Sequence, residues 1–241
     1  MAKVRAALLA AGRGVRMGGG TPKTLLPVGE NGPLLQYIVS GLQKAGVEEL
    51  LVVTGHRAEE IQTAATEAWG ATGITFLRNM RYASWGNFHS VRVALDASPG
   101  MDLMVVNCDI VVHPEVYTRV LEKEGELILA VQRRQRLDQE DMRVQLKGDR
   151  VLGVSKHLAI GESHGEYAGV SLLRGLGHRR YIDECSARQW RAETSGYYED
   201  VYNSIIPKVD ARAATVAAGE YAEVDTPEDV PAASEVIERH F

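Results

Sequence analysis

Short apolar runs alternate with stretches of helical periodicity along the first half of the chain. The segment Val4–Ala10 is apolar on both faces and ends just before Gly12, which predicts a fully buried strand. Leu34–Ala45 has the spacing of an amphipathic helix and stops at Gly46. Further strands are predicted at Glu49–Thr54, Ile74–Leu77, Leu103–Asn107 and Leu127–Gln132, and further helices at Arg57–Trp69, Phe88–Ala97 and Pro114–Glu122.

The pattern changes in the second half of the chain. Short predicted strands with polar gaps lie at Met142–Leu146, Val151–Ser155 and Tyr167–Leu172, and they suggest an antiparallel extension over one side of the sheet. Later elements are predicted helices near Gly177–Trp190 and Tyr198–Ile205, a strand at Ala213–Ala217 and a terminal helix that starts near Thr226-Pro227.

Strand–helix alternation with short connections is typical of an α/β fold. We predict a Rossmann-like, mostly parallel central sheet with helices on both faces and a small antiparallel extension. Ligands of such sheets bind at the carboxyl ends of the strands. The loop that follows Ala10, and Asp109 after Leu103–Asn107, are both expected at such ends.

Length, composition and charge narrow the class of protein. The 241 residues suit one large domain, or one domain with a modest insert, and a net charge of −5 without a strongly basic region argues against nucleic acid as the main partner. No apolar stretch approaches the roughly 20 residues that span a bilayer, so no membrane insertion is expected. Cys108 and Cys185 form no zinc or disulfide pattern, which fits a reducing compartment. We therefore expect a cytoplasmic protein.

The glycine-rich loop after the first strand is compared with three phosphate-binding patterns. The dinucleotide pattern G-x-G-x-x-G has Met17 at its third glycine, and the P-loop pattern is broken because Pro22 precedes Lys23-Thr24. The third pattern fits: LAAGRGVRM at 9–17 followed by PKTLLPV at 22–28 resembles the signature loop of nucleotidyltransferases that make NDP-linked products.

The chemistry of this loop suits a triphosphate. Glycines let backbone N–H groups approach phosphate oxygens closely. Arginine and lysine side chains would neutralise the β- and γ-phosphates, which leave as pyrophosphate. The predicted nucleotide-binding residues of the loop are Ala10, Ala11, Gly12, Arg13 and Gly14, and the predicted catalytic cations are Arg16 and Lys23. The alternative is a solvated glycine loop with incidental charges.

Two aspartates are candidates for a divalent cation. Nucleotidyl transfer needs such a cation on the α-phosphate, and Mg²⁺ prefers carboxylates and phosphate oxygens. Asp109 ends the segment MVVNCD, and Asp225 ends YAEVD just before TPEDV. In the resembled family an aspartate after the central strand and one in a late E-[IV]-D-T-P-E-D segment hold this Mg²⁺, although this chain has Cys108 where the family usually has glycine. The alternative for Asp109 is a turn residue at the end of a strand, and the alternative for Asp225 is a residue at the start of a helix.

Other stretches resemble the phosphocholine and phosphonate cytidylyltransferases. RNMRYASWGNFHSVRVAL, at 78–95, resembles the segment of those enzymes that lines nucleotide and acceptor, and it implies nucleotide-binding roles for Asn87 and Ser90. EDMRVQLKGDRVLGVSKHL, at 140–158, resembles their substrate-covering strands and implies that Lys156 acts on the α-phosphate or the acceptor phosphoryl group. The resemblance implies a single nucleotidyltransferase domain over 1–241, GT-A-like in fold, with a substrate-covering insert around 133–172.

The run Tyr197-Tyr198-Glu199-Asp200 places aromatic rings beside carboxylates. Such a set holds an ammonium group by cation–π contact and charge, which would suit phosphocholine or 2-aminoethylphosphonate. Trp85 and Tyr167 would add aromatic walls to this acceptor site. The alternative is a helix start with an acidic bias and tyrosines packed on the core. In that case a hydroxyalkyl phosphonate or inositol phosphate would fit better.

These observations favour a Mg²⁺-dependent cytidylyltransferase. It would transfer CMP from CTP to a small phosphate- or phosphonate-bearing acceptor and release pyrophosphate, mainly by positioning and charge neutralisation. One alternative is a nucleotidyltransferase for a sugar-1-phosphate, inositol-1-phosphate or molybdopterin; another is a nucleotide-binding regulatory module without activity. A nicotinamide-dependent oxidoreductase is disfavoured by Met17. A homodimer is left open.

Overall fold

The predicted elements are largely present in the computed structural model, which describes residues 4–14, 21–28 and 32–241. The helices are α1 (Leu34–Lys44), α2 (Ala58–Trp69), α3 (Phe88–Asp96), α4 (Pro114–Glu122), α5 (Gly175–Trp190), α6 (Tyr198–Ile205) and α7 (Val230–His240). The strands are β1 (Val4–Ala10), β2 (Glu49–Thr54), β3 (Ile74–Arg78), β4 (Asp102–Asn107), β5 (Ile110–Val112), β6 (Leu127–Gln132), β7 (Arg143–Lys147), β8 (Arg150–Ser155), β9 (Gly165–Leu173), β10 (Ala211–Val216) and β11 (Tyr221–Glu223). The short strands β5 and β11 are not predicted by the sequence pattern.

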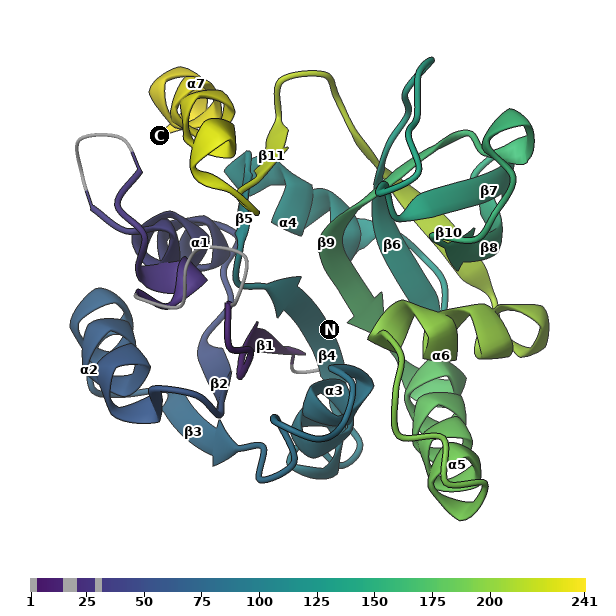
Figure 1. Cartoon of the computed structure of the whole chain (residues 1–241), viewed down its shortest axis with the longest axis horizontal. Helices are drawn as coiled ribbons and strands as arrows, with labels where there is room; N and C mark the ends of the chain where they lie inside the picture. Colours follow the sequence, from purple (N-terminus) through teal and green to yellow (C-terminus); the bar gives the residue numbers. More distant parts are fainter. Residues whose placement is uncertain (1–3, 15–20, 29–31) are drawn as a thin grey trace.

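The main sheet is mixed rather than mostly parallel, so this part of the prediction is wrong. Its strand order is β3-β2-β1-β4-β9-β6-β10-β8-β7 (Figure 1). Within the described chain, the ladders β1–β2, β2–β3, β1–β4 and β6–β10 are parallel. The ladders β4–β9, β6–β9, β8–β10, β7–β8 and β7–β9 are antiparallel.

Strand β9 causes the difference. We expected Tyr167–Leu172 in a peripheral extension, but β9 lies between β4 and β6 in the middle of the sheet, and all nine of its residues are buried. Leu173 pairs with both Leu103 and Leu127, which shows how the strand bridges the two parallel groups. Apolar composition identifies a central strand but carries no information on its direction, because direction depends on the path of the connecting chain.

The predicted antiparallel extension is present in the hairpin β7–β8. Strand β8 pairs with β10, and β7 also pairs with β9, so strands β9, β6, β10, β8 and β7 form a closed ring. The ring lies on the right of Figure 1, away from α1 and α2. Closure removes the free edge that a hairpin would otherwise expose.

Alternate residues of the strands supply two hydrophobic cores, one on each face of the sheet. Leu8 and Val52 face a core shared with α1, α2 and α4, whereas Leu9 and Val53 face a core shared with α3, α5 and α6. This alternation follows from the two-residue period of a strand, and it confirms the expectation of helices on both faces. Among the described residues no helix is both long and apolar enough to cross a membrane.

A third, smaller core holds α7 and β11 beside the carboxyl ends of β1 and β4. Helix α7 packs against β5 and β11, which pair antiparallel with Glu223 opposite Ile110. The backbone N–H of Val224 donates to the carbonyl of Asp109 at 2.7 Å. A segment more than 100 positions later in the sequence is thereby held beside the loop that follows β4.

Candidate functional site

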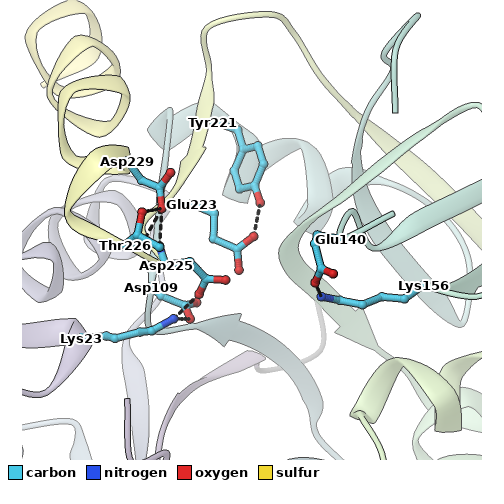
Figure 2. Close-up of polar contacts among 9 residues, drawn as sticks. All are labelled: Lys23, Asp109, Glu140, Lys156, Tyr221, Glu223, Asp225, Thr226 and Asp229. Atoms are coloured by element: carbon cyan, nitrogen blue, oxygen red, sulfur yellow. Dashed lines mark hydrogen bonds and ion pairs between the residues drawn. The ribbon is translucent and has the colours of Figure 1, made fainter. Parts of the chain in front are cut away.

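Three carboxylates meet where β4 and β11 end and β5 begins. Asp109 lies between β4 and β5, Glu223 ends β11, and Asp225 lies just beyond it; oxygens of the three lie within 4.8 Å of one another (Figure 2). The β5–β11 pairing and the Val224–Asp109 backbone hydrogen bond bring them together. The structure thus places the two predicted metal aspartates side by side and adds Glu223.

The backbone around Asp225 is held by a neighbouring cap. The Asp229 carboxylate accepts hydrogen bonds from the backbone N–H groups of Asp225, at 2.9 Å, and Thr226, at 2.7 Å. Thr226 and Asp229 form a capping box at the start of a short 3₁₀ helix, Pro227–Asp229. The sequence TPED thus stabilises the turn that presents Asp225 to the site.

Lys23 lies among the carboxylates. It begins a 3₁₀ helix, Lys23–Leu25, and its Nζ donates to Asp109 Oδ2 at 3.2 Å and to Asp225 Oδ1 (Figure 2). Burial alone would lower the pKa of Lys23, but Asp109 and Asp225 outweigh it and the pKa is raised. The ammonium is therefore charged and neutralises part of the acidic cluster.

The carboxylates still hold more negative charge than one lysine neutralises. Desolvation, and then the charge of Asp225, raise the pKa of Asp109 against the opposing effect of Lys23. Desolvation together with Asp109 and Asp225 raises the pKa of Glu223 to about 8. Clustered carboxylates with raised pKa values fit a divalent cation, because bound charge relieves their mutual repulsion. This donor set, all oxygen, fits Mg²⁺.

A cavity of about 350 Å³ lies beside the opening loop. It is lined by Ala10, Ala11, Gly12, Gly14, Lys23, Asn87, Ser90, Asn107 and Asp109, among others. Most of the residues predicted to bind nucleotide are thus brought together around one space. Arg13 is exposed and is not among the lining residues, and Arg16 lies outside the described residues.

Ser90 is nearly fully buried at the wall of this cavity. Its Oγ accepts a hydrogen bond from Asn79 Nδ2 at 2.9 Å. The first turn of α3 is therefore tied to the residue that follows β3, and the serine contributes a fixed polar group to the wall.

A second cavity, of about 250 Å³, adjoins the first and is strongly acidic. Lys23, Asn87, Asn107 and Asp109 line both cavities and so mark their junction. Of the residues that the structure describes, eight carboxylates and two lysines line the second cavity. These carboxylates are Asp109, Asp138, Glu140, Asp141, Glu166, Glu199, Glu223 and Asp225.

Lys156 lies across the second cavity from Lys23. Its Nζ is 3.5 Å from Glu140 Oε2 (Figure 2). The same atom lies 5.7 Å from the centroid of the Tyr197 ring. Glu140 is largely exposed, so this ion pair is weak. The ion pair with Glu140 therefore does little to hold the ammonium of Lys156 in place.

The four residues of the YYED run separate into two pairs. Tyr197 and Glu199 line the second cavity, and burial raises the pKa of Glu199 to about 8. Glu199 Oε2 is buried and has no hydrogen-bond partner among the described residues. Tyr198 and Asp200 are not among the lining residues: Tyr198 is fully buried, and the Asp200 carboxylate accepts from the Tyr197 N–H at 2.7 Å as part of a capping box.

The two predicted aromatic walls also differ. Tyr167 on β9 is buried and lines the second cavity. Trp85 is stacked on Phe88, with ring centroids 5.9 Å apart, and the Arg81 guanidinium lies 4.0 Å from its ring centroid. Trp85 is not among the residues that line either cavity.

Several residues of the site are missed by sequence reasoning. The sequence spacing could have predicted Glu223, because it stands two residues before Asp225 and alternate positions of an extended segment share a side. Asn107 could also have been predicted, because it is the last residue of a predicted strand and ligands bind at strand ends. No local feature of the sequence predicts the loop carboxylates Asp138, Glu140 and Asp141, because the sequence of a polar loop does not show which cavity it faces.

Solved structures of other proteins have a fold similar to that of this chain. The CTP:phosphocholine cytidylyltransferase LicC from Streptococcus pneumoniae is 18% identical, with a TM-score of 0.78 over 98% of this chain and 99% of that chain. The inositol-1-phosphate CTP transferase from T. maritima is also 18% identical, with a TM-score of 0.81 over 98% of this chain and 97% of that chain. At this identity the likeness concerns the fold.

Sequence comparisons add two relatives. The bifunctional protein GlmU of Sorangium cellulosum is 30% identical over 132 residues, which are 52% of this chain and 28% of that protein. The CMP-5'-(3-aminopropyl)phosphonate synthase of Streptomyces rubellomurinus is 32% identical over 120 residues, which are 48% of this chain and 19% of that protein. The matches thus span less than a third of either relative. Residues 6–193 match the MobA-like NTP transferase domain, and the chain belongs to this family.

Proposed function

We propose that the protein transfers CMP from CTP to a small phosphate or phosphonate that also carries an ammonium group, with release of pyrophosphate. The observation that carries this proposal is the pair of adjoining cavities. One lies beside the glycine loop. The other is lined, within the part of the chain that the structure describes, by eight carboxylates, and Glu199 Oε2 is buried there without a hydrogen-bond partner.

The first cavity suits the nucleotide. Backbone groups of Gly12 and Gly14 and the side chain of Lys23 line it, and they offer N–H and ammonium donors to phosphate oxygens. Cytosine as the base is supported only by the names of similar proteins. Two of these names contain CTP, and a third is that of a synthase for a CMP-linked phosphonate.

The second cavity suits an acceptor with a positive end. Glu199 Oε2, which has no hydrogen-bond partner among the described residues, would gain one from an ammonium group, whereas a neutral sugar offers no positive charge to its ionised form. The phosphoryl end of the same acceptor would lie toward Lys156 and the junction with the first cavity. The 3-aminopropylphosphonate in the name of one relative has both ends.

The reaction would need little covalent chemistry from the protein. Mg²⁺ held by Asp109, Glu223 and Asp225 would supply positive charge at the α-phosphate. Lys23 would neutralise the departing pyrophosphate, and Lys156 would orient the acceptor phosphoryl group from the other side. An ionised phosphoryl oxygen is already a nucleophile, so in-line attack on the α-phosphorus needs no general base.

The test is pyrophosphate release with Mg²⁺, four nucleoside triphosphates and a panel of acceptors. The panel holds phosphocholine, 2-aminoethylphosphonate, 3-aminopropylphosphonate, 2-hydroxyethylphosphonate, inositol-1-phosphate and glucose-1-phosphate. We expect turnover with CTP and an ammonium-bearing acceptor. Equal or better turnover of 2-hydroxyethylphosphonate would contradict the ammonium site, because the two ethylphosphonates differ only in that group.

A sugar- or inositol-phosphate nucleotidyltransferase is the second candidate. It is favoured by the inositol-1-phosphate CTP transferase among the similar proteins. Turnover restricted to inositol-1-phosphate or glucose-1-phosphate would establish it. The carboxylate cluster and Lys23 would keep their roles in that case, but Glu199 would not.

The Glu199 assignment predicts a specific pH dependence. Burial raises the pKa of Glu199 to about 8, whereas pairing with an ammonium needs the ionised form, so the KM for an ammonium-bearing acceptor should fall as pH rises toward 8. In Glu199→Gln this KM should rise about 10- to 100-fold and lose that pH dependence, from the usual strength of a charged hydrogen bond. The KM for CTP should stay unchanged. The measurement is the KM for the acceptor as a function of pH. A range of roughly pH 6 to 9 extends about one unit or more on each side of the pKa.

The protein should become less stable over the same pH range in which it binds the acceptor more tightly. A folded-state pKa above the unfolded value means that the folded protein holds this proton more tightly, so the free energy of unfolding falls as pH rises toward 8. Glu199→Gln should lack this fall and be at least as stable as the wild type at alkaline pH. Glu162→Gln, an exposed residue away from both cavities, is the matched control. A Glu199→Gln protein with an unchanged acceptor KM would contradict the assignment.

A further inference from the structure

Two asparagine amides at the junction of the cavities are held by the same residue, Tyr198. The Tyr198 backbone N–H donates to Asn87 Oδ1 at 2.8 Å, and its phenolic hydroxyl donates to Asn107 Oδ1 at 2.7 Å. Asn87 and Asn107 both line both cavities, whereas Tyr198 is fully buried behind them. Segments from three distant parts of the sequence meet at this point.

The contact with Asn87 settles the orientation of that amide. A backbone N–H only donates, so the group facing it must be the carbonyl oxygen of the asparagine. Asn87 precedes α3, where asparagine commonly caps the helix, but its side chain makes no capping hydrogen bond there. It caps the first turn of α6 instead.

The contact with Asn107 depends on a buried group of hydroxyls. The hydroxyl of Tyr198 lies 3.1 Å from that of Tyr167, which in turn lies 3.0 Å from Ser171 Oγ. Ser171 Oγ lies 2.8 Å from the Tyr202 hydroxyl. On its other side Asn107 is confined by Gly169, where an added Cβ would lie 3.1 Å from Asn107 Nδ2. The amide of Asn107 therefore has little freedom to rotate.

The loop that carries Asn87 is fastened to the segment that carries Tyr198. The Gly86 N–H donates to the carbonyl of Thr194 at 2.7 Å, and a Cβ on Gly86 would lie 1.9 Å from the carbonyl oxygen of Gly196. Only glycine permits this approach. The distance between Asn87 and Tyr198 is thus set by backbone contact.

Both amides keep their donors for a ligand. Each Oδ1 is occupied by Tyr198, and within the described part of the chain neither Nδ2 has a hydrogen-bond acceptor. Nδ2 carries two N–H donors, and phosphoryl oxygens are acceptors. Lys23 and Asp109 are the other residues shared by both cavities, so the amides border the place where nucleotide and acceptor would meet.

We propose that Tyr198 is a positioning residue that aims the amides of Asn87 and Asn107 at the phosphoryl group transferred between the two cavities. The proposal rests on the proposed nucleotidyl transfer. It gives Tyr198 a role different from the direct acceptor contact expected from the YYED run. A donor fixed before reaction is effective because no reorganisation is needed as charge shifts in the transition state.

Tyr198→Phe is the first test, because it removes the hydroxyl that contacts Asn107 and Tyr167 and keeps the ring. We expect kcat to fall about 10-fold, at the lower end of the loss from a misplaced transition-state donor, with the KM for CTP changed little. Asn107→Ala should show a similar fall, and the double variant should fall no further, because the hydroxyl acts only through that amide. Asn87→Ala should combine multiplicatively with Tyr198→Phe, because the backbone N–H that holds Asn87 remains.

Tyr202→Phe is the matched control. It removes a buried hydroxyl from the same group without touching either asparagine, and it should keep the wild-type kcat. Multiplicative effects of Tyr198→Phe and Asn107→Ala would overturn the proposal, as would an unchanged kcat in Tyr198→Phe. An equal loss of kcat in Tyr202→Phe would also overturn it, because the hydroxyl group would then be structural only.

NMR separates this proposal from the proposed function. The side-chain amide signals of Asn107 in the free protein are identified by their absence in Asn107→Ala. We expect Tyr198→Phe to shift or broaden them and Tyr202→Phe to leave them in place. Unchanged signals in Tyr198→Phe would overturn the positioning role even in an active enzyme. Absence of turnover with every acceptor, together with the expected NMR shift, would contradict the proposed function and leave the held amide supported.

Discussion

Asp109→Asn should lower kcat by at least about 10³-fold, from the several kcal/mol that a bound metal ion contributes to the transition state. Asp109 is the central member of the carboxylate cluster: it contacts Lys23, and its backbone accepts from Val224. An amide keeps the shape of the side chain but removes the negative charge that would hold Mg²⁺. The measurement is pyrophosphate release at saturating Mg²⁺, CTP and acceptor.

The fold should survive this change. Desolvation and the charge of Asp225 raise the pKa of Asp109, so its ionised form is already disfavoured in the folded protein. The melting temperature should therefore change little. Asp183→Asn, on the exposed side of α5, is the control for loss of one charge and should keep full activity. Full activity in Asp109→Asn would contradict the metal site.

Lys23→Ala should lower kcat about 10²- to 10³-fold, the usual effect of removing one group that stabilises transition-state charge. It should also make stability depend more strongly on Mg²⁺. Without the ammonium, Asp109, Glu223 and Asp225 lose the positive charge of Lys23, which destabilises the folded state wherever they are ionised. Thermal unfolding with and without millimolar Mg²⁺ measures this effect independently of turnover.

The sign of the pH dependence follows from the same repulsion. Lys23→Ala should be less stable than the wild type near neutral pH, and the deficit should shrink as pH falls and the carboxylates take up protons. Lys156→Ala is the matched control for stability, because Lys156 makes a weak ion pair with the exposed Glu140. Equal stabilisation of wild type and Lys23→Ala by Mg²⁺ would contradict the view that lysine and metal ion neutralise the same carboxylates.

Local signals predicted most of the elements. A buried strand needs only a short apolar run, and an amphipathic helix needs only its period, so β1, β2, β4, β6 and helices α1 to α4 were found close to their observed ends. The glycine loop and the two aspartates were found because each lies at the end of such an element. Strands β5 and β11 have three residues each, too few for a period to be read.

The side chains of the site were predicted less completely than its position. Of the YYED run, Tyr197 and Glu199 line the second cavity, while Asp200 caps α6. Tyr198 is buried behind the junction, as α6 turns its residues in different directions. The face that a residue shows depends on what its helix packs against, which the local sequence does not contain.

The sequence by itself determined where strands and helices form and which loop and carboxylates lie at strand ends, because these depend on neighbours along the chain. Only the tertiary structure decided the antiparallel course of β9, the approach of Glu223 and Asp225 to Asp109, and the convergence of Asn87 and Asn107 on Tyr198. Each of these joins segments distant in sequence. The energy that selects them comes from pairing and burial across the whole fold, which no short stretch of residues specifies.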